Sequence, residues 1–265
     1  MSKNIVLPIY TKEIAMPLLP LDRGMKNDAV KRVQEWLVLA GHNLVIDGDY
    51  GPATAAAVAK AKEAGHVGNP PYNGDVVDAA TWNEISRSLT TAVARIEGQE
   101  QFARAVVVAA ERYLNAKARE VGGDNKGVWQ RHFSRGRENQ PWCQDFASTC
   151  WFDAARGVFA MELPFPLCDD NGVASSYVPW VANEARRAAK FVPGTRVANI
   201  LPGSMFFVRT GNPSVPYSHV GIVVADRGDR VETIEGNTND DGSANGYKVC
   251  RRSRPKSSLD FGVAV

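Results

Sequence analysis

The stretch SHVGIVVADRGDRVETIEGN, residues 218–237, contains two runs rich in β-branched residues on either side of the polar sequence DRGDR. Such runs, separated by turn-forming residues, predict two strands that pair through a turn. His219 stands at the start of the first strand, and Glu235 and Asn237 stand in the polar end of the second. Similar strand-like segments lie on both sides, GSMFFVRT at 203–210 and a last stretch ending in DFGVAV at 260–265. The C-terminal part of the chain is therefore predicted to form an antiparallel sheet.

Helical periodicity dominates the residues that precede these strands. Apolar side chains recur at helical spacing from about Glu97 to Gly122, from Trp142 to Ala155 and from Tyr177 to Ala189. Helices followed by an antiparallel sheet are typical of an α+β domain.

Three shorter helices are predicted nearer the amino terminus. The first has Asn27 or Asp28 as a cap and Gly41 as a stop, the second starts near Pro52, and the third has Asp78 as its cap. We expect an N-terminal extension at 1–20, a small three-helix domain at 21–90, a linker at 91–99 and the α+β domain at 100–265.

Composition excludes several classes of protein. The 265 residues are 44% hydrophobic and 23% charged, which is typical of a globular protein and not of a disordered one. Lys and Arg number 31 against 29 Asp and Glu, a net charge of +2, so we expect no nucleic-acid partner. No apolar run reaches the roughly 18 residues of a membrane span, and the first 24 residues lack the apolar core of a secretory signal. These features predict synthesis in the cytosol and no stable membrane insertion.

Cys143 is the strongest candidate for chemistry. In QPWCQDFASTCW, residues 140–151, it follows Pro141 at the start of a predicted helix. The positive end of the helix dipole favours the thiolate, which is the nucleophilic form of cysteine. A buried structural cysteine is the plainer alternative, and it is the one that we prefer for Cys150.

A cysteine nucleophile needs an imidazole within reach to take and return a proton. His42 and His66 fall among the N-terminal helices and His132 in a predicted polar loop before Cys143, so His219 is the best candidate. Glu235 or Asn237 would then bond the second imidazole nitrogen and fix its tautomer.

The motifs PWC, SHVGIV and IEGN, in this order, resemble the CHAP domain (cysteine, histidine-dependent amidohydrolase/peptidase). The resemblance covers about residues 95–265 and implies a papain-like fold that cleaves peptidoglycan amide bonds. It implies that Cys143 is the nucleophile, that His219 is the general base and acid, and that Glu235 orients His219, with Asn237 as a further polar member. The Cys143 backbone N–H would contribute to an oxyanion hole. Gln140 is a candidate side-chain donor, and Trp142 a candidate substrate contact.

The N-terminal helices resemble a second family, the three-helix peptidoglycan-binding domain of type 1. The matching sequences are AVKRVQEWLVLAG, DGDYGPAT and VVDAATW, within about residues 21–89. The resemblance implies wall binding, with Asp47 and Tyr50 as candidate ligand contacts. Ala61 and Lys62 stand where that family usually has a Phe-Gln pair.

No metal and no cofactor is expected. Residues 47–51 lack the spaced carboxylates of a calcium loop, and DDNG at 169–172 is typical of a turn. Cys143 and Cys150 lie about 10 Å apart along one predicted helix, too far for a disulfide, while pairing of Cys168 with Cys250 stays open. The basic segment CRRSRPK at 250–256 is expected to be solvated.

Together these features predict a monomeric peptidoglycan hydrolase that resembles bacteriophage endolysins and acts at the cell wall after holin-type release. An N-acetylmuramoyl-L-alanine amidase and a peptidoglycan endopeptidase remain equal alternatives. An effector delivered by a contact-dependent secretion system would use the same chemistry. A catalytically inert wall-binding or virion protein is the alternative from another class, and it requires His219 to lie out of reach of Cys143.

Overall fold

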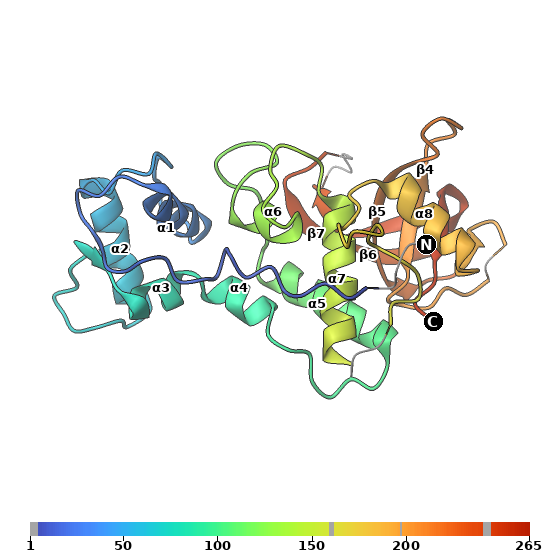
Figure 1. Cartoon of the computed structure of the whole chain (residues 1–265), viewed down its shortest axis with the longest axis horizontal. Helices are drawn as coiled ribbons and strands as arrows, with labels where there is room; N and C mark the ends of the chain where they lie inside the picture. Colours follow the sequence, from blue (N-terminus) through green and yellow to red (C-terminus); the bar gives the residue numbers. More distant parts are fainter. Residues whose placement is uncertain (1–4, 159–161, 197, 241–244) are drawn as a thin grey trace. The chain divides into compact units, whose positions relative to one another are not determined.

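The computed structural model describes residues 5–158, 162–196, 198–240 and 245–265, and the chain forms two compact units (Figure 1). The helical unit consists of Tyr10–Thr91 and Arg119–Glu138. The sheet unit consists of Met1–Ile9, Ala92–Ala118 and Asn139–Val265.

This division differs from the domain boundaries expected from the sequence. The expected N-terminal extension is shared between the two units, and its residues 1–4 lie outside the described part of the chain. The segment 119–138, expected in the α+β domain, belongs by its contacts to the helical unit.

The helical unit contains short helices and one pair of two-residue strands. Their bounds are β1 Leu21–Asp22, α1 Asp28–Leu39, α2 Pro52–Ala64, β2 Val76–Val77, α3 Ala79–Ile85, α4 Arg87–Ala92 and α6 Val128–Phe133. The predicted start signals are confirmed, because Asn27 accepts a hydrogen bond from the Val30 backbone N–H and Asp78 accepts one from that of Thr81. Pro52 is the first residue of α2.

Gln34, on the buried side of α1, holds the glycine-rich turn between α1 and α2. Its amide nitrogen donates to Asp47 Oδ1 at 2.8 Å, to the Asp49 carbonyl and to Thr54 Oγ1. Its amide oxygen accepts from the backbone N–H of Asp47 and Gly48. One buried side chain therefore bonds two N–H groups, a carbonyl and a carboxylate of this turn.

The polar run before Cys143 is not the loop that the sequence suggested. It contains α6, whose Trp129 packs edge-on against Trp36 of α1. The guanidinium of Arg131, also on α6, bonds the buried carboxylates of Glu13 and Glu35 and the carboxylate of Glu138. The shared aromatic and ionic contacts explain why this segment joins the helical unit.

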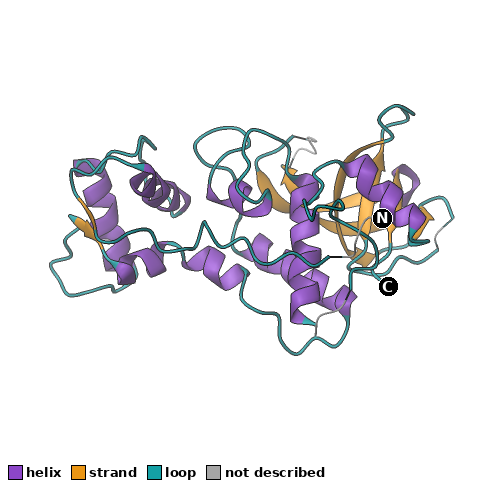
Figure 2. Ribbon diagram, viewed as in Figure 1, coloured by secondary structure: helices purple, strands orange, loops and turns teal. Residues whose placement is uncertain are grey.

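The sheet unit is built on a six-stranded antiparallel sheet in the order β3-β8-β4-β5-β6-β7 (Figure 2). The strands are β3 Phe191–Pro193, β4 Met205–Arg209, β5 Tyr217–Asp226, β6 Arg230–Thr238, β7 Lys248–Pro255 and β8 Leu259–Gly262. The helices are α5 Phe102–Asn115, α7 Cys143–Gly157 and α8 Val178–Arg187, with a 3-10 turn at Lys256–Ser258. The predicted α+β class, helices with an antiparallel sheet, is confirmed.

Helix α5 and strands β3 and β7 also differ from expectation. Helix α5 ends at Asn115, before Gly122, because Lys117 adopts a left-handed conformation (φ 55°) and the N–H groups of Lys117 and Ala118 bond back to the last turn. The basic segment 250–256 is not a solvated tail, since most of it forms β7 and pairs with β6. Strands β3 and β7 were not predicted.

Helices α5 and α7 pack against each other and against β5 and β6 (Figure 1). Gly236 of β6 permits the close approach of α7, because a Cβ atom there would lie 2.6 Å from Phe146 Cβ and 2.7 Å from Trp142 Cζ3. Buried apolar side chains around Phe206 form a core cluster of the sheet. Its members are Ile200, Phe206, Val223, Val231, Leu259 and Phe261. The start of α7 is thereby fixed on the sheet.

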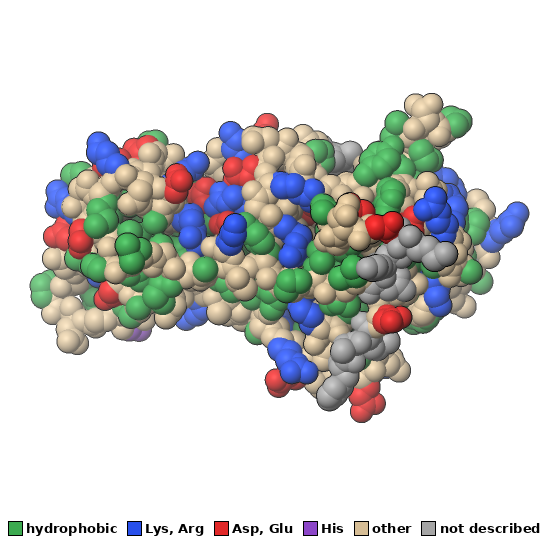
Figure 3. All heavy atoms as spheres, viewed as in Figure 1, with side chains coloured by type: hydrophobic (Ala, Val, Ile, Leu, Met, Phe, Trp, Pro, Cys, Tyr) green, Lys and Arg blue, Asp and Glu red, His purple; other side chains and the backbone are tan. Residues whose placement is uncertain are grey.

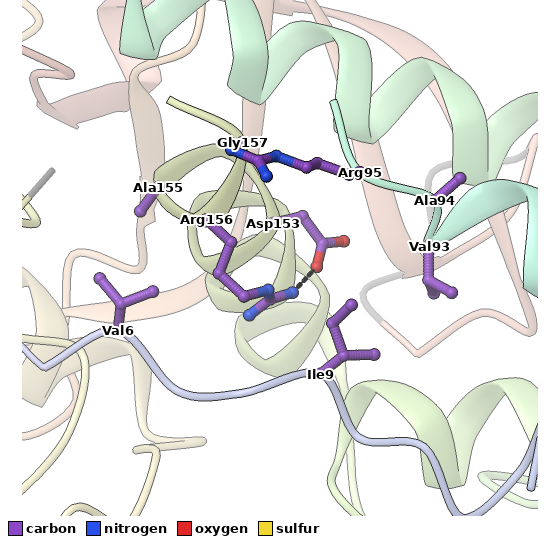
Figure 4. Close-up of a pocket in the computed structure, with 9 residues that line it drawn as sticks. All are labelled: Val6, Ile9, Val93, Ala94, Arg95, Asp153, Ala155, Arg156 and Gly157. Carbon is purple, nitrogen blue, oxygen red and sulfur yellow. Dashed lines mark hydrogen bonds and ion pairs between the residues drawn. The ribbon is translucent and has the colours of Figure 1, made fainter. Parts of the chain in front are cut away.

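A cavity of about 740 Å³ lies in the sheet unit beside the second half of α7 (Figure 4). Asp153 lines it, buried, and accepts a hydrogen bond from Tyr113 while pairing with Arg156. Arg156 also donates to the Leu7 carbonyl, which ties the N-terminal segment to α7.

Charged side chains of both signs are intermixed on the face that Figure 3 shows. None of the described helices is long and apolar enough to cross a membrane. All four cysteines belong to the described part of the chain, are buried and form no disulfide, so Cys168 and Cys250 do not pair.

We expect Gln34→Ala to lower the free energy of unfolding by about 2–3 kcal/mol, because it leaves the N–H groups of Asp47 and Gly48 without their acceptor. Urea unfolding followed by tryptophan fluorescence measures this. Lys31→Ala, an exposed change on the same helix, should alter stability by less than about 0.5 kcal/mol. Equal losses in the two variants would contradict the assigned role of Gln34.

Asp153 should make the fold less stable as pH rises. Burial raises the pKa of its carboxyl from 3.8 to about 6, against the opposing influence of Arg156 and Tyr113. The folded state therefore binds this proton more tightly than the unfolded state, and the resulting stabilisation disappears between about pH 4 and pH 6. Asp153→Asn should thus lose less stability than the wild type between pH 4 and pH 7, by on the order of 2 kcal/mol. Thermal or urea unfolding at both pH values tests this, with the exposed Glu100→Gln as a control that should follow the wild type.

Candidate active site

Cys143 is the first residue of α7 and is buried, with 5% of its surface exposed. The first N–H groups of a helix have no acceptor within the helix, and they lie at the positive end of its dipole. Cys143 therefore stands where the first N–H groups of α7 can donate hydrogen bonds to an oxygen that develops negative charge beside the cysteine sulfur.

His219 lies near the start of β5 and is almost completely buried. Its Nε2 atom lies 2.9 Å from Glu235 Oε2, whereas its Nδ1 atom has no partner at hydrogen-bond geometry among the described residues. Burial alone would lower the pKa of His219, but Cys143 and Glu235 outweigh burial and raise it to about 9. Since Nε2 is occupied by Glu235, Nδ1 is the ring nitrogen that has no partner within the described structure.

Glu235 is fully buried on β6 and has partners on both carboxylate oxygens. Oε1 accepts hydrogen bonds from Thr233 Oγ1 and Arg254 Nε, each at 2.6 Å. Oε2 accepts from Arg254 Nη2 at 2.6 Å and faces His219. Burial would raise the pKa of this carboxyl, yet Arg254 and His219 lower it to about 2. Glu235 is therefore an anion across the physiological pH range.

The backbone around this pair leaves room for the glutamate. A Cβ atom on Gly221 would lie 3.0 Å from Glu235 Cγ and 2.9 Å from Phe206 Cε1. The missing side chain at 221 gives Glu235 the space it occupies beside His219, and explains the glycine in SHVGIV.

Of the alternatives for the partner of His219, the structure places Glu235 and not Asn237 beside the ring. Asn237 is buried on the same strand, but its Nδ2 atom donates to Asn245 Oδ1 at 3.4 Å. Its Oδ1 atom has no partner among the described residues.

Gln140 and Trp142 flank the start of α7 in different ways. The Gln140 amide nitrogen lies 3.5 Å from Asp145 Oδ2. A role for Gln140 as an oxyanion donor stays a prediction. Trp142 was predicted to contact substrate. It has no exposed surface, however, and so it presents no face to substrate. It packs instead against Gly236, where it helps to fix Cys143.

The two expected ligand contacts of the helical unit differ in their exposure. Asp47 is exposed on the turn that Gln34 holds. Tyr50 is completely buried and donates to the Gly74 carbonyl at 2.6 Å, which makes it a core residue and not a surface contact.

Sequence reasoning missed three residues near the candidate site. Arg254 and Thr233 donate hydrogen bonds to Glu235. Asp145, two residues after Cys143 on α7, accepts a hydrogen bond from Ser176 at 2.6 Å. A strand pattern in KVCRRSRP would have placed Arg252 and Arg254 on the same side as Cys250, and so inward, had it been recognised.

Comparison with protein families finds a CHAP domain at residues 135–237. This range includes Cys143, His219 and Glu235, whereas Arg254 lies beyond it. A CHAP domain in general indicates a cysteine- and histidine-dependent amidohydrolase or peptidase that acts on peptidoglycan. No curated protein and no solved structure matches the chain.

The described residues contain no group of three or more His, Cys, Asp or Glu side chains that could hold a metal ion. The turn at DDNG uses its first acid internally, because Asp169 Oδ1 accepts hydrogen bonds from the N–H groups of Asn171 and Val173.

We expect His219 to remain protonated at neutral pH and to titrate near pH 9. Glu235→Gln removes the anion beside Nε2, so the pKa of His219 should fall by about 1–3 units. Nitrogen-15 NMR of the histidine side chains measures this change. His42, in the helical unit, is the internal control and should titrate as in the wild type. An unchanged pKa of His219 in Glu235→Gln would contradict the pairing of His219 with Glu235.

Proposed function

We propose that this protein is an endolysin-like peptidoglycan hydrolase that cleaves amide bonds of stem peptides through a covalent Cys143 intermediate. The observation that carries the proposal is the pairing of His219 Nε2 with the buried, ionised carboxylate of Glu235, which leaves Nδ1 without a partner among the described residues. Cys143, the first residue of α7, raises the pKa of this histidine. An inert wall-binding protein would have no need of this arrangement. That alternative requires His219 to lie out of reach of Cys143, and the influence of Cys143 on the pKa of His219 speaks against it.

In this proposal the Cys143 thiolate attacks the carbonyl carbon of the scissile amide and forms a tetrahedral intermediate. Backbone N–H groups at the start of α7 stabilise its oxyanion. The His219 imidazolium donates its Nδ1 proton to the departing amine, and the C–N bond breaks to leave a thioester. Neutral His219 then takes a proton from water, the resulting hydroxide attacks the thioester, and the carboxylic acid product and Cys143 are released.

Glu235 contributes by holding Nε2, which keeps Nδ1 directed to the reacting atoms. Because Glu235 is an anion, it also favours the imidazolium that the first step consumes and the second regenerates. The preference of His219 for the protonated form therefore suits it to act as the acid that expels the amine.

We further propose that the helical unit binds the cell wall as a type 1 peptidoglycan-binding domain, with exposed Asp47 as a ligand contact. A wall-binding unit on the same chain would raise the effective concentration of substrate at the site without new contacts there. The proposed place of action is the cell wall, reached after holin-type release or delivery, and the proposed state is a monomer.

The experiment is mass spectrometry of fragments released from purified diaminopimelate-type sacculi by the wild type and by Cys143→Ala. We expect the variant to release fragments at least on the order of a thousandfold more slowly, because it lacks the nucleophile. Cys168→Ala, which removes a buried thiol of the same unit, is the matched control and should retain activity. Free stem peptides would define an amidase, and peptides cut within or between stems an endopeptidase. Equal release by wild type and Cys143→Ala, on these and on lysine-type walls, would refute the proposal.

A further inference from the structure

Arg254 donates hydrogen bonds to both oxygens of the Glu235 carboxylate. Its Nε and Nη2 atoms donate to Oε1 and Oε2, both at 2.6 Å, and the arginine side chain is only 17% exposed. Two parallel hydrogen bonds from a planar guanidinium to a carboxylate define the orientation of the carboxylate as well as its charge.

The surroundings of this pair are apolar on one side. The guanidinium carbon of Arg254 lies 5.6 Å from the centre of the Phe206 ring, and the same ring lies 6.3 Å from that of His219. Phe206 belongs to the buried cluster of the sheet. A carboxylate at such a position is costly without a cation, because water is not available to solvate it.

Few ionisable groups face Glu235 and His219 within the described part of the chain. They are Cys143 from α7, and Arg254 and Cys250 from β7, with the hydroxyl of Thr233 as a neutral donor from β6. With Cys143 as thiolate and His219 as imidazolium, Arg254 offsets the charge of Glu235 and the buried group is neutral overall. Without Arg254 the same group would carry one net negative charge.

We propose that Arg254 is a positioning residue of the hydrolase site, which acts by holding the Glu235 carboxylate ionised and oriented so that Oε2 meets His219 Nε2. The inference rests on the proposed function and deepens it. It adds to the cysteine, histidine and glutamate a fourth residue, from a strand beyond the range in which the CHAP domain is found.

Charge and shape have separable effects at this position. A neutral side chain at 254 leaves excess negative charge at the site, so protons bind more tightly to the whole group and both limbs of a pH profile should move to higher pH. Lysine retains the charge but not the two-pronged geometry. Arg254→Lys should therefore keep the positions of the limbs and lower only the maximal rate.

The test measures two pH profiles for the full-length wild type, Arg254→Met, Arg254→Lys and Arg251→Met. One is kcat/KM for release of fragments from sacculi, and the other is the rate of Cys143 alkylation by iodoacetamide, which needs no substrate. Arg254→Met should lower kcat/KM by on the order of tenfold to a hundredfold and raise both limbs by about one pH unit. Arg251→Met changes an exposed residue of the same strand that pairs with Glu111, and its profiles should match those of the wild type.

A double-mutant cycle separates positioning from a merely structural role. If Arg254 acts through Glu235, Arg254→Met should have little further effect in a Glu235→Gln background. Independent, additive losses of rate in the two variants would overturn the inference, as would an Arg254→Met profile that is lowered without a shift in pH. Should Arg254→Met fail to fold, Arg254→Lys decides the matter, since unchanged kcat/KM in that variant would also overturn it.

The two proposals fail in different ways. If the wild type and Arg251→Met release nothing from any sacculus, the proposed function is wrong, and the alkylation profiles still test whether Arg254 governs the site. If the wild type is active and Arg254→Met shifts neither profile, only the role of Arg254 is wrong.

Discussion

A carboxylate that is wholly removed from water must find a donor for each of its oxygens, and the candidate site depends on meeting that need for Glu235. The donors come from three adjacent strands, His219 from β5, Thr233 from β6 and Arg254 from β7. The sheet order β5-β6-β7 is what makes them neighbours. The site is thus a property of the completed sheet. His219 owes its orientation to an anion that the sheet keeps ionised, and its preference for a proton to Cys143 together with that anion.

The position of Cys143 depends on packing, whereas the orientation and the pKa of His219 depend on neighbouring charge. Cys143 has its position because α7 lies close against β6, where Gly236 leaves room for Trp142 and Phe146. Trp142 is therefore important to the site without being open to substrate. Residues next to a candidate nucleophile in sequence need not be open to solvent, since packing at the start of a buried helix directs some of them to the core.

Sequence reasoning succeeded where the signal was local. The caps at Asn27 and Asp78, the antiparallel strands and the class α+β follow from short-range patterns. It failed where the partner is distant in sequence. Helix α6 was hidden because two of the carboxylates that Arg131 bonds, those of Glu13 and Glu35, lie about a hundred residues away in sequence. Strand β7 was hidden because its arginines look like those of a solvated segment until β6 lies beside them. The candidate triad could be inferred because each member stands in a recognisable motif, whereas nothing local marks Arg254 as the partner of Glu235.

The helical unit is assembled from two stretches of chain, Tyr10–Thr91 and Arg119–Glu138. During synthesis the first stretch leaves the ribosome before Arg131 exists, so Glu13 and Glu35 must wait for their cation. In evolution, a recombination event within residues 91–99 would transfer the first helices without Trp129 and Arg131, and would leave two buried glutamates and a tryptophan face uncovered. The helical unit of this protein is therefore expected to be inherited together with the segment that leads into Cys143, and not to be exchanged between enzymes as an independent cassette.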